Sequence, residues 1–439
     1  MSVIVRQHPT SPNMANNHLV YQVDSNQDSQ PQHKIVMDIK DGNDVLLQRV
    51  KQSVGPNGVA VFDIGQIMTQ YVGPAKADFD LSSATLSSNV GMDIKVYFGE
   101  QYATSLTGTV TLYTGAGGAG EPSVTPKSYV YIFDGAKDDT EGASFNYDKK
   151  HYNEENATDD GVFNHQNALT DFVNNRVTPT DHHSLTFFQG NADGNVDATN
   201  AQDIFSAIIT QYDAQNVLLS TSTIYNLTLR QNSSQAFADV VNNQNGSTRM
   251  VSLPVGPGNG SFALEGDCTE YKVLVCSQAT DRESNESGIW GTYWFKVEDC
   301  VNEEDKTRFA WQNKYGGWDF FTFIGARTAS SNIERMSYKQ SFVDYTGQEG
   351  WNPERRGETT LVNKIQRRFG ANTDYLTKAE SELLVGLYYS NNVYVEENGN
   401  YYPVVITSAD VTERTNPRTQ KLFSHQVEYR MSNTKANRQ

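Results

Sequence analysis

Short runs of alternating apolar and polar residues, separated by turns rich in Gly, Asn and Asp, recur along most of the chain. Residues 33–50 alternate in this way around Asp41-Gly42, which predicts a β-hairpin. Residues 58–72 predict a strand that leads into a short helix or loop, and residues 90–102 predict another strand. A period of two is typical of strands with one buried face. The chain is therefore predicted to be mainly β.

A Gly-rich stretch at residues 114–126 divides the strand pattern into two parts. Short strands between turns, repeated on both sides of such a joint, are typical of two immunoglobulin-like β-sandwiches. The expected order is an N-terminal arm at residues 1–30, a β-sandwich at 31–125, a second β-sandwich at 127–325 with an acidic excursion at 134–160, and a small α+β domain at 326–439. We expect the polar arm to be ordered only where another element holds it.

The last third of the chain carries the clearest helix signal. Thr377 and Glu380 have the spacing of a capping box, and three leucines follow on one helical face. Asn398-Gly399 lies between two strand-like runs and predicts a hairpin, and residues 423–432 predict a terminal strand. A helix beside several strands indicates an α+β domain.

Composition excludes several classes of protein. The net charge of −17 argues against a general nucleic-acid coat, which needs clustered Lys and Arg to bind phosphate. No apolar run approaches the length that spans a bilayer, and the N-terminus has no apolar signal core, so neither membrane insertion nor export is expected. The three cysteines are an odd number without CxxC spacing and are predicted to be reduced thiols.

Charge is unevenly spread along the chain. Residues 134–160 carry nine acids against three lysines, a net charge of −6. From Pro417 to the end the net charge is +4, because Glu428 faces five basic residues: Arg418, Lys421, Arg430, Lys435 and Arg438. One interpretation is two solvated surfaces. The other is that the basic tail of one subunit docks on an acidic face of its neighbour.

Motifs that would carry chemistry are weak. Gly115-x-Gly117-x-x-Gly120 matches a dinucleotide fingerprint, but prolines follow where a helix must begin. Asp181-His182-His183 is the best metal candidate, although adjacent histidines on a strand point to opposite faces. Residues 191–197 resemble part of a calcium loop without its distal Glu. We expect no catalytic, cofactor-binding or metal-binding residue and no enzymatic activity.

Residues 309–323, FAWQNKYGGWDFFTF, concentrate six Phe or Trp residues around a Gly-Gly pair. The segment predicts two strands joined by a turn at residues 315–317. Apolar residues occupy both faces of the second strand, which is typical of a strand buried on both sides. The candidate interface residues are Phe309, Trp311, Tyr315, Trp318, Phe320, Phe321 and Phe323, together with the five basic residues of the tail. The alternatives are an assembly contact and a packed core within one chain.

The same segment carries a resemblance. RFAWQN and YGGWDFFTF, together with KIVMDIK, GVAVFDIGQIMTQYV, VYFGEQY, PVVITSADVTE and KLFSHQVEYRMS, resemble structural proteins of tailed phages that infect Bacteroidota. The crAss-like podoviruses are the most similar in style, and the likeness is to the stacked ring proteins of their tail barrels. The likeness is loose but runs over most of the chain, except the acidic excursion at residues 134–160. The motifs are structural, so no active site is implied.

The resemblance implies a non-enzymatic virion protein, a ring subunit of the phage tail barrel near the portal. Its partners would be further copies in a closed homo-oligomeric ring and other tail or portal proteins, with DNA passing through the ring without specific binding. Assembly would take place in the host cytoplasm. A ring requires heterologous interfaces, in which two different patches of neighbouring subunits meet. The alternative is a carbohydrate-binding adhesin or receptor-binding tail protein, in which an exposed Trp318 or Trp351 stacks on sugar rings. A hydrolase is a third, weaker alternative.

Overall fold

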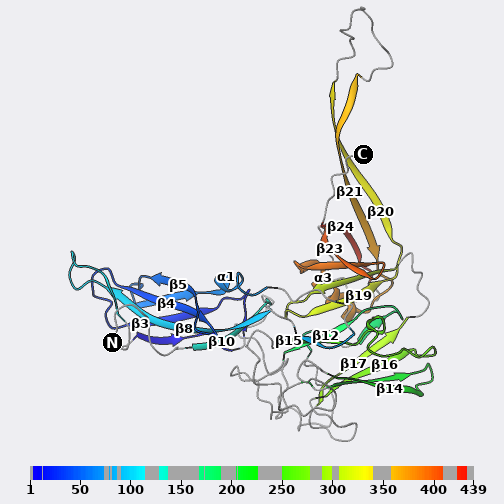
Figure 1. Cartoon of the computed structure of the whole chain (residues 1–439), viewed down its shortest axis with the longest axis horizontal. Coiled ribbons are helices and arrows are strands. Elements are labelled where there is room, and N and C mark those ends of the chain that lie inside the picture. The colour runs from blue at the N-terminus through cyan, green and yellow to red at the C-terminus, as the bar shows by residue number, and fades with distance from the viewer. Residues whose placement is uncertain are drawn as a thin grey trace, which may run out of the picture. The chain divides into compact units, whose positions relative to one another are not determined.

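The computed structural model describes about two thirds of the chain, and the chain is mainly β. The described residues are 3–11, 13–73, 79, 82–86, 90–113, 128–136, 168–172, 174–188, 204, 206–225, 250–276, 289–298, 306–339, 357–408 and 423–432. Two compact units are distinguished: Met1–Asp299 with Gln312–Phe320, and Cys300–Trp311 with Phe321–Gln439. The first unit contains two β-sandwiches, and the second is a smaller α+β unit (Figure 1).

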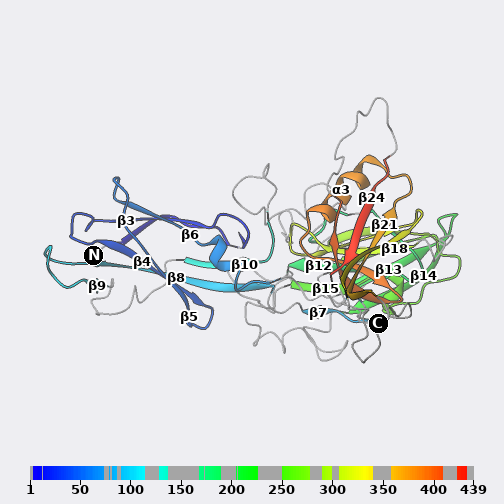
Figure 2. The same ribbon diagram turned by 90° about the horizontal axis from the view of Figure 1, so that it is seen from above.

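The first sandwich packs a three-stranded sheet, in the order β1-β3-β6, on a six-stranded sheet, β2-β10-β8-β4-β5 with β9 on β8 (Figure 2). Inward residues such as Tyr21, Phe62 and Phe98 belong to one core cluster that draws on both sheets. The strands are β1 (Val3–Gln7), β2 (Asn13–Met14), β3 (Val20–Ser25), β4 (Lys34–Asp41), β5 (Leu46–Gln52), β6 (Val59–Asp63), β8 (Gly91–Tyr102), β9 (Thr111–Tyr113) and β10 (Ser128–Phe133), with the short helix α1 (Gly65–Met68) after β6.

Several predicted elements of this sandwich are confirmed. The hairpin around Asp41-Gly42 is β4–β5, and residues 58–72 form a strand followed by a helical turn. The prediction that residues 1–30 form an arm outside the sandwich is wrong for the residues described. β3 pairs with both β1 and β6, and its inward side chains Tyr21 and Val23 are fully buried. Two inward apolar residues in alternation are enough to place this polar stretch in the sandwich.

The second sandwich combines a five-stranded sheet, β11-β17-β16-β13-β14, with a three-stranded sheet, β12-β15-β7. One core cluster takes residues from both sheets, including Phe187, Ile209 and Phe295. The elements are β7 (Thr85–Leu86), β11 (Asn174–Val177), β12 (Ser184–Phe188), β13 (Ser206–Tyr212), β14 (Leu218–Tyr225), β15 (Met250–Pro254), the 3₁₀ turn η6 (Pro257–Asn259), β16 (Glu270–Cys276) and β17 (Ile289–Val297).

The two sandwiches do not divide at the Gly-rich stretch. β10 lies after the predicted boundary at residues 125–127, yet it pairs with β8 in the first sandwich. β7 lies before that boundary, yet it pairs with β15 in the second sandwich. Each sandwich therefore takes a strand from the other side of the joint. Local patterning predicts strands but not long-range pairing, which is why the boundary was misplaced.

The second unit is built on a seven-stranded sheet in the order β19-β18-β22-β23-β24-β21-β20. Its elements are β18 (Thr307–Gln312), β19 (Trp318–Phe323), β20 (Thr328–Lys339), β21 (Glu358–Asn372), helix α3 (Lys378–Tyr389), β22 (Val393–Glu397), β23 (Asn400–Ile406) and β24 (Gln426–Met431). The capping box at Thr377 and Glu380, the Asn398-Gly399 hairpin and the terminal strand are all confirmed. The helix packs through Leu384 and Leu387, both fully buried.

Candidate functional site

The aromatic segment folds as the hairpin β18–β19, and its tip and its base belong to different units. Residues 312–320 belong to the first unit, and residues 307–311 and 321–323 to the second. Both strands of the hairpin therefore pass from one unit to the other. We call residues 307–323 the aromatic hairpin and describe its two halves separately.

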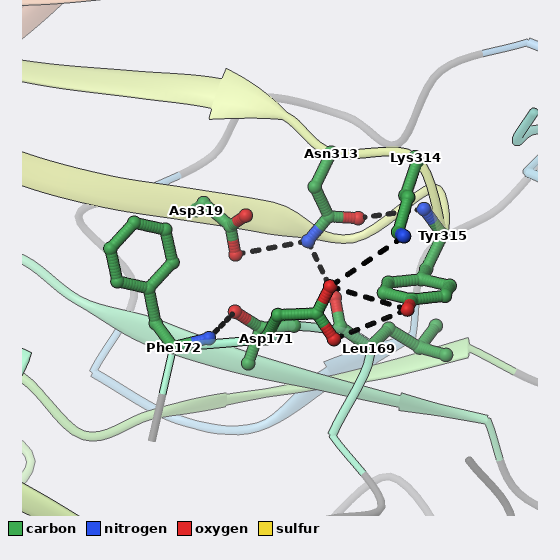
Figure 3. A network of polar contacts seen from close by, with 8 residues as sticks. Leu169, Asp171, Phe172, Asn313, Lys314, Tyr315 and Asp319 are labelled. Carbon is green, nitrogen blue, oxygen red and sulfur yellow. Dashed lines mark hydrogen bonds and ion pairs between the residues drawn. The ribbon is translucent and has the colours of Figure 1, made fainter. Parts of the chain in front are cut away.

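At the tip, Asn313 organises the turn (Figure 3). Its side-chain Oδ1 accepts hydrogen bonds from the backbone N–H groups of Tyr315 and Gly317, at 3.0 and 3.1 Å. Its Nδ2 donates to the backbone carbonyl of Leu169 at 2.5 Å and to the Asp319 carboxylate at 2.9 Å. One amide thus closes the turn and ties it to a segment about 140 residues earlier. An Asn side chain can do both because it carries an acceptor and two donor hydrogens.

The two glycines of the turn are required by close backbone approach. Gly316 has a φ of +80°, and a Cβ built on it would lie 1.9 Å from the carbonyl oxygen of Asp134. A Cβ on Gly317 would lie 2.6 Å from the carbonyl oxygen of Leu169. The N–H of Ala136 donates to the Lys314 carbonyl at 2.9 Å. The tip is therefore held between two backbone segments of its own unit, and no side chain larger than hydrogen fits at either position.

The remaining polar groups of the tip lie nearer the solvent. The hydroxyl of Tyr315 donates to the Asp171 carboxylate, 3.1 Å from Oδ1, and the Lys314 ammonium lies 3.8 Å from Oδ2 of the same carboxylate. The ammonium also lies 5.1 Å from the centroid of the Tyr315 ring. These groups pair with one another, as Figure 3 shows, and the chemistry of this corner is that of a structural clasp.

Aromatic residues of the tip half pack inside the first unit. Phe79 meets the rings of both Trp318 and Phe320 edge-to-face, at centroid distances of 4.9 and 5.3 Å. The ring of His183 lies 4.8 Å from that of Phe320 and 4.9 Å from that of Phe295. Edge-to-face contacts of this kind add to the stabilisation that burial alone provides.

Aromatic residues of the base half pack inside the second unit. Phe309 meets Phe323 and Tyr429 edge-to-face, at 5.0 and 5.2 Å. Trp311 is fully buried, and a Cβ on Gly386 of α3 would lie 3.3 Å from its indole nitrogen. Arg308, 1% exposed, donates to the Thr322 hydroxyl at 2.6 Å. The predicted strands, turn and facing of the aromatic residues are thus all present.

Burial decides between the two alternatives for the six Phe and Trp residues. All six are at most 4% exposed within the single chain, so they form its interior and leave no face for another subunit. Burial of Trp318 also removes it as a surface for stacking on sugars. Trp351 lies outside the described residues.

The remaining candidate interface residues divide into two groups. Tyr315 and Arg430 are half-buried. Outside the described residues lie Arg418, Lys421, Lys435 and Arg438, and most of the acidic excursion at residues 134–160.

The predicted metal candidate is a packed polar turn. Both oxygens of the Asp181 carboxylate accept from Thr178, from its N–H at 2.9 Å and from its hydroxyl at 2.7 Å. His183 lies between aromatic rings, as described above. Within the described ranges, no three His, Cys, Asp or Glu side chains come together as a metal site. The fingerprint at residues 115–120 and the calcium-like residues 191–197 lie outside those ranges.

A buried polar trio in the first sandwich was not predicted. Oε2 of Glu100 accepts from the Ser25 hydroxyl at 2.5 Å and lies 3.2 Å from Nε2 of His33. All three residues are buried. Serine and histidine contact the carboxylate and not each other, which is not the geometry of an activated nucleophile. The three residues come from two strand ends and a loop, and no local motif connects them.

The exposed ribbon formed by β20 and β21 was not predicted either. Its two strands pair from Thr328 with Gly370 to Lys339 with Glu358, and every residue of β20 is exposed. In Figure 1 the ribbon projects from the seven-stranded sheet. A strand without a buried face has no reason to alternate apolar and polar residues, so the usual signal is missing. We call residues 328–339 and 358–372 the ribbon.

Comparison with known proteins adds no family. Neither the known protein-family models nor the curated proteins contain a match to this sequence. The longest helix in the described part of the chain has 12 residues, and none there has the length and apolar character of a membrane span.

Proposed function

We propose that this protein is a structural subunit of a tailed-phage particle, one that forms a closed ring in the tail barrel near the portal. The resemblance of the sequence to crAss-like ring proteins supports this proposal, and so does the ribbon. The observation that carries most weight is the length of the exposed ribbon. Its first strand, β20, has 12 residues and extends about 40 Å at roughly 3.3 Å per residue.

Support for the ribbon within the chain ends early. Only the last four residues of β21, Phe369–Asn372, pair with β24. Beyond them the ribbon is two strands wide in the described structure, with β20 at the edge of the sheet. A two-stranded ribbon is at best marginally stable in water. A long ribbon of this kind is best explained by a partner that supports it in the assembled state.

The buried aromatic hairpin contributes to this proposal in a different way. A ring subunit binds a neighbour on each side, so it needs a rigid fold that holds the two interfaces in fixed positions. The turn that Asn313 and Gly316 close, together with the buried aromatic cluster, makes the fold rigid. Contacts with neighbouring subunits are then made by exposed elements. The proposal therefore gives the aromatic hairpin the role of an internal anchor.

The test is the state of association of the full-length protein. We expect light scattering and negative-stain electron microscopy to show discrete closed rings, for the protein alone or with its neighbours from the particle. A protein that stays monomeric at all concentrations, and that is not found in purified particles, would contradict the proposal. Turnover of a polysaccharide by the purified protein would instead support a hydrolase.

A further inference from the structure

The ribbon carries an excess of positive charge on a strongly acidic chain. Its strands contain five Arg or Lys against two Glu, a net charge of +3, whereas the whole chain carries −17. Three apolar or aromatic residues of β20 are also exposed: Ile333 at 45%, Met336 at 62% and Tyr338 at 44%. A basic surface with exposed apolar side chains is suited to an acidic protein surface, to which it offers both charge and apolar contact.

One face of the ribbon brings two arginines together with two isoleucines. Ile333 lies opposite Ile365, and Ser331 lies opposite Arg367. Residues opposite each other across an antiparallel pair share a face, as do alternate residues of one strand, which adds Arg335. We call Ser331, Ile333, Arg335, Ile365 and Arg367 the isoleucine face. Arg335 and Arg367 are exposed, and neither has an acidic partner in the described structure.

The opposite face has a different character. Asn332 lies opposite Gln366, and Ser330 lies opposite Arg368. Glu334 also points to this side, because it alternates with Ile333 along β20. This face also carries the exposed Met336, which alternates with Glu334, and its charged residues are of both signs. Of the two faces, the isoleucine face is the one that combines two arginines with paired isoleucines and has no acidic residue among its named members.

We propose that the isoleucine face of the ribbon docks on an acidic surface of a second copy of this chain. The inference rests on the proposed function, since a closed ring places a second copy beside each subunit. Charge complementarity selects the partner: the ribbon is positive and the chain that it would meet is strongly negative. Nucleic acid fits less well, because the negative chain repels phosphate and the paired isoleucines have no role in backbone contacts.

The first test compares charge reversals on the two faces of the full-length protein. Arg335→Glu with Arg367→Glu changes the isoleucine face, and Arg368→Glu changes the opposite face at the neighbouring residue. We expect the first variant to weaken self-association by on the order of tenfold or more, and Arg368→Glu to leave it near the wild-type value. Ile333→Ser should weaken association in the same direction without reversing a charge. Circular dichroism melting curves verify that each variant is folded.

A photo-crosslinking residue identifies the partner. Placed at position 333, it should yield adducts between two copies of this chain, with the crosslinked peptide identified by mass spectrometry. Placed at position 366, on the opposite face, it should yield few. Adducts at 333 with DNA, or only with another particle protein, would overturn the inference.

The results separate this inference from the proposed function. Rings that form normally in all three variants would overturn the docking of the ribbon and leave the ring function standing. A wild-type chain that remains monomeric, and is absent from the particle, would overturn both. Loss of association in the isoleucine-face variants alone supports both.

Discussion

Two consecutive hairpins of this protein are opposites in burial. The aromatic hairpin is buried on every strand residue except Gln312, whereas the next hairpin, the ribbon, exposes every residue of its first strand. The first carries Phe and Trp on both faces, whereas the second has one Tyr and one Phe among many Ser, Thr, Asn and Arg residues. The same backbone motif is therefore used once to build the interior and once to reach outward. Aromatic content therefore marks the buried anchor of this fold, and the candidate assembly surface lies where aromatic residues are scarce.

The largest expected loss of stability comes from removing a buried side chain of the aromatic hairpin. Trp311→Ala should lower the free energy of unfolding by about 3–5 kcal/mol, the usual cost of removing a buried Trp. The matched change on the ribbon, Met336→Ala, should alter it by less than about 0.5 kcal/mol, because Met336 is 62% exposed. Chemical denaturation monitored by circular dichroism measures both. Equal costs at the two positions would remove the contrast between the hairpins.

A pair of glycines separates the cost of an unfavourable backbone conformation from the cost of a steric clash. Gly316 and Gly399 have nearly the same positive φ, +80° and +76°, but a Cβ on Gly399 meets nothing within 4 Å. Gly399→Ala should therefore cost only the backbone penalty, about 1–2 kcal/mol. Gly316→Ala should cost clearly more, because the carbonyl of Asp134 must also move. Thermal melts of the two variants decide this, and a smaller loss at Gly316 would show that the tip is not tightly seated.

The Asn313 clasp is expected to have an intermediate effect. Asn313→Ala removes the acceptor of two backbone N–H groups and the donor to the Leu169 carbonyl, which should cost about 1–3 kcal/mol. Asn313→Asp keeps the acceptor, loses the donor and places a second carboxylate beside Asp319. Recovery of part of the stability in Asn313→Asp would assign that part to the turn. An Asn313→Ala variant as stable as wild type would contradict the proposed role.

The smallest expected effect is a pH dependence in the second unit. Burial lowers the pKa of His425, whose Nε2 lies 2.8 Å from the Ser381 hydroxyl. Because the folded-state pKa lies below the unfolded value of 6.5, the unfolded chain binds the extra proton first. The contribution of His425 to the free energy of unfolding is therefore fully present above pH 6.5, and it is lost as the pH falls below that value. The decline should be shallower in His425→Gln when urea midpoints are compared between pH 7.5 and 5.5.

His18 provides a comparison of opposite sign, because its hydrogen bond to Asp63 raises its pKa. Its contribution has the opposite sign, since it is present at low pH and lost as the pH rises. A His425→Gln variant with an unchanged pH profile would show that His425 does not titrate between the folded and unfolded states.

Sequence patterns predicted the elements whose information is local. The capping box at Thr377, the Asn398-Gly399 turn and the facing of Trp318 and Phe320 each depend on residues within a few positions of one another. The same reasoning failed where the partner is distant. Nothing near Thr85 indicates that it pairs with Ser252, and nothing near Gly316 indicates the carbonyl of Asp134.

The candidate site follows the same division. The aromatic hairpin could be recognised from composition, but its role could not, because buried aromatic cores and protein interfaces share the same residues. Both faces of Trp318–Phe323 are apolar, and only the positions of Phe79, His183 and Tyr429 show that the chain itself covers such residues. The sequence of the ribbon shows no alternation of apolar and polar residues that would have predicted its strands, because its own chain does not bury it along most of its length.

Hydrogen–deuterium exchange of the full-length protein, as monomer and as assembly, distinguishes a buried aromatic hairpin from a ribbon that a partner covers. We predict that peptides covering residues 307–323 are protected in both states. Peptides covering residues 328–339 and 358–368 should exchange rapidly in the monomer and become protected on assembly, because a two-stranded ribbon opens easily until a partner supports it. The opposite result, protection gained on assembly by the aromatic hairpin while the ribbon stays unchanged, would contradict the account.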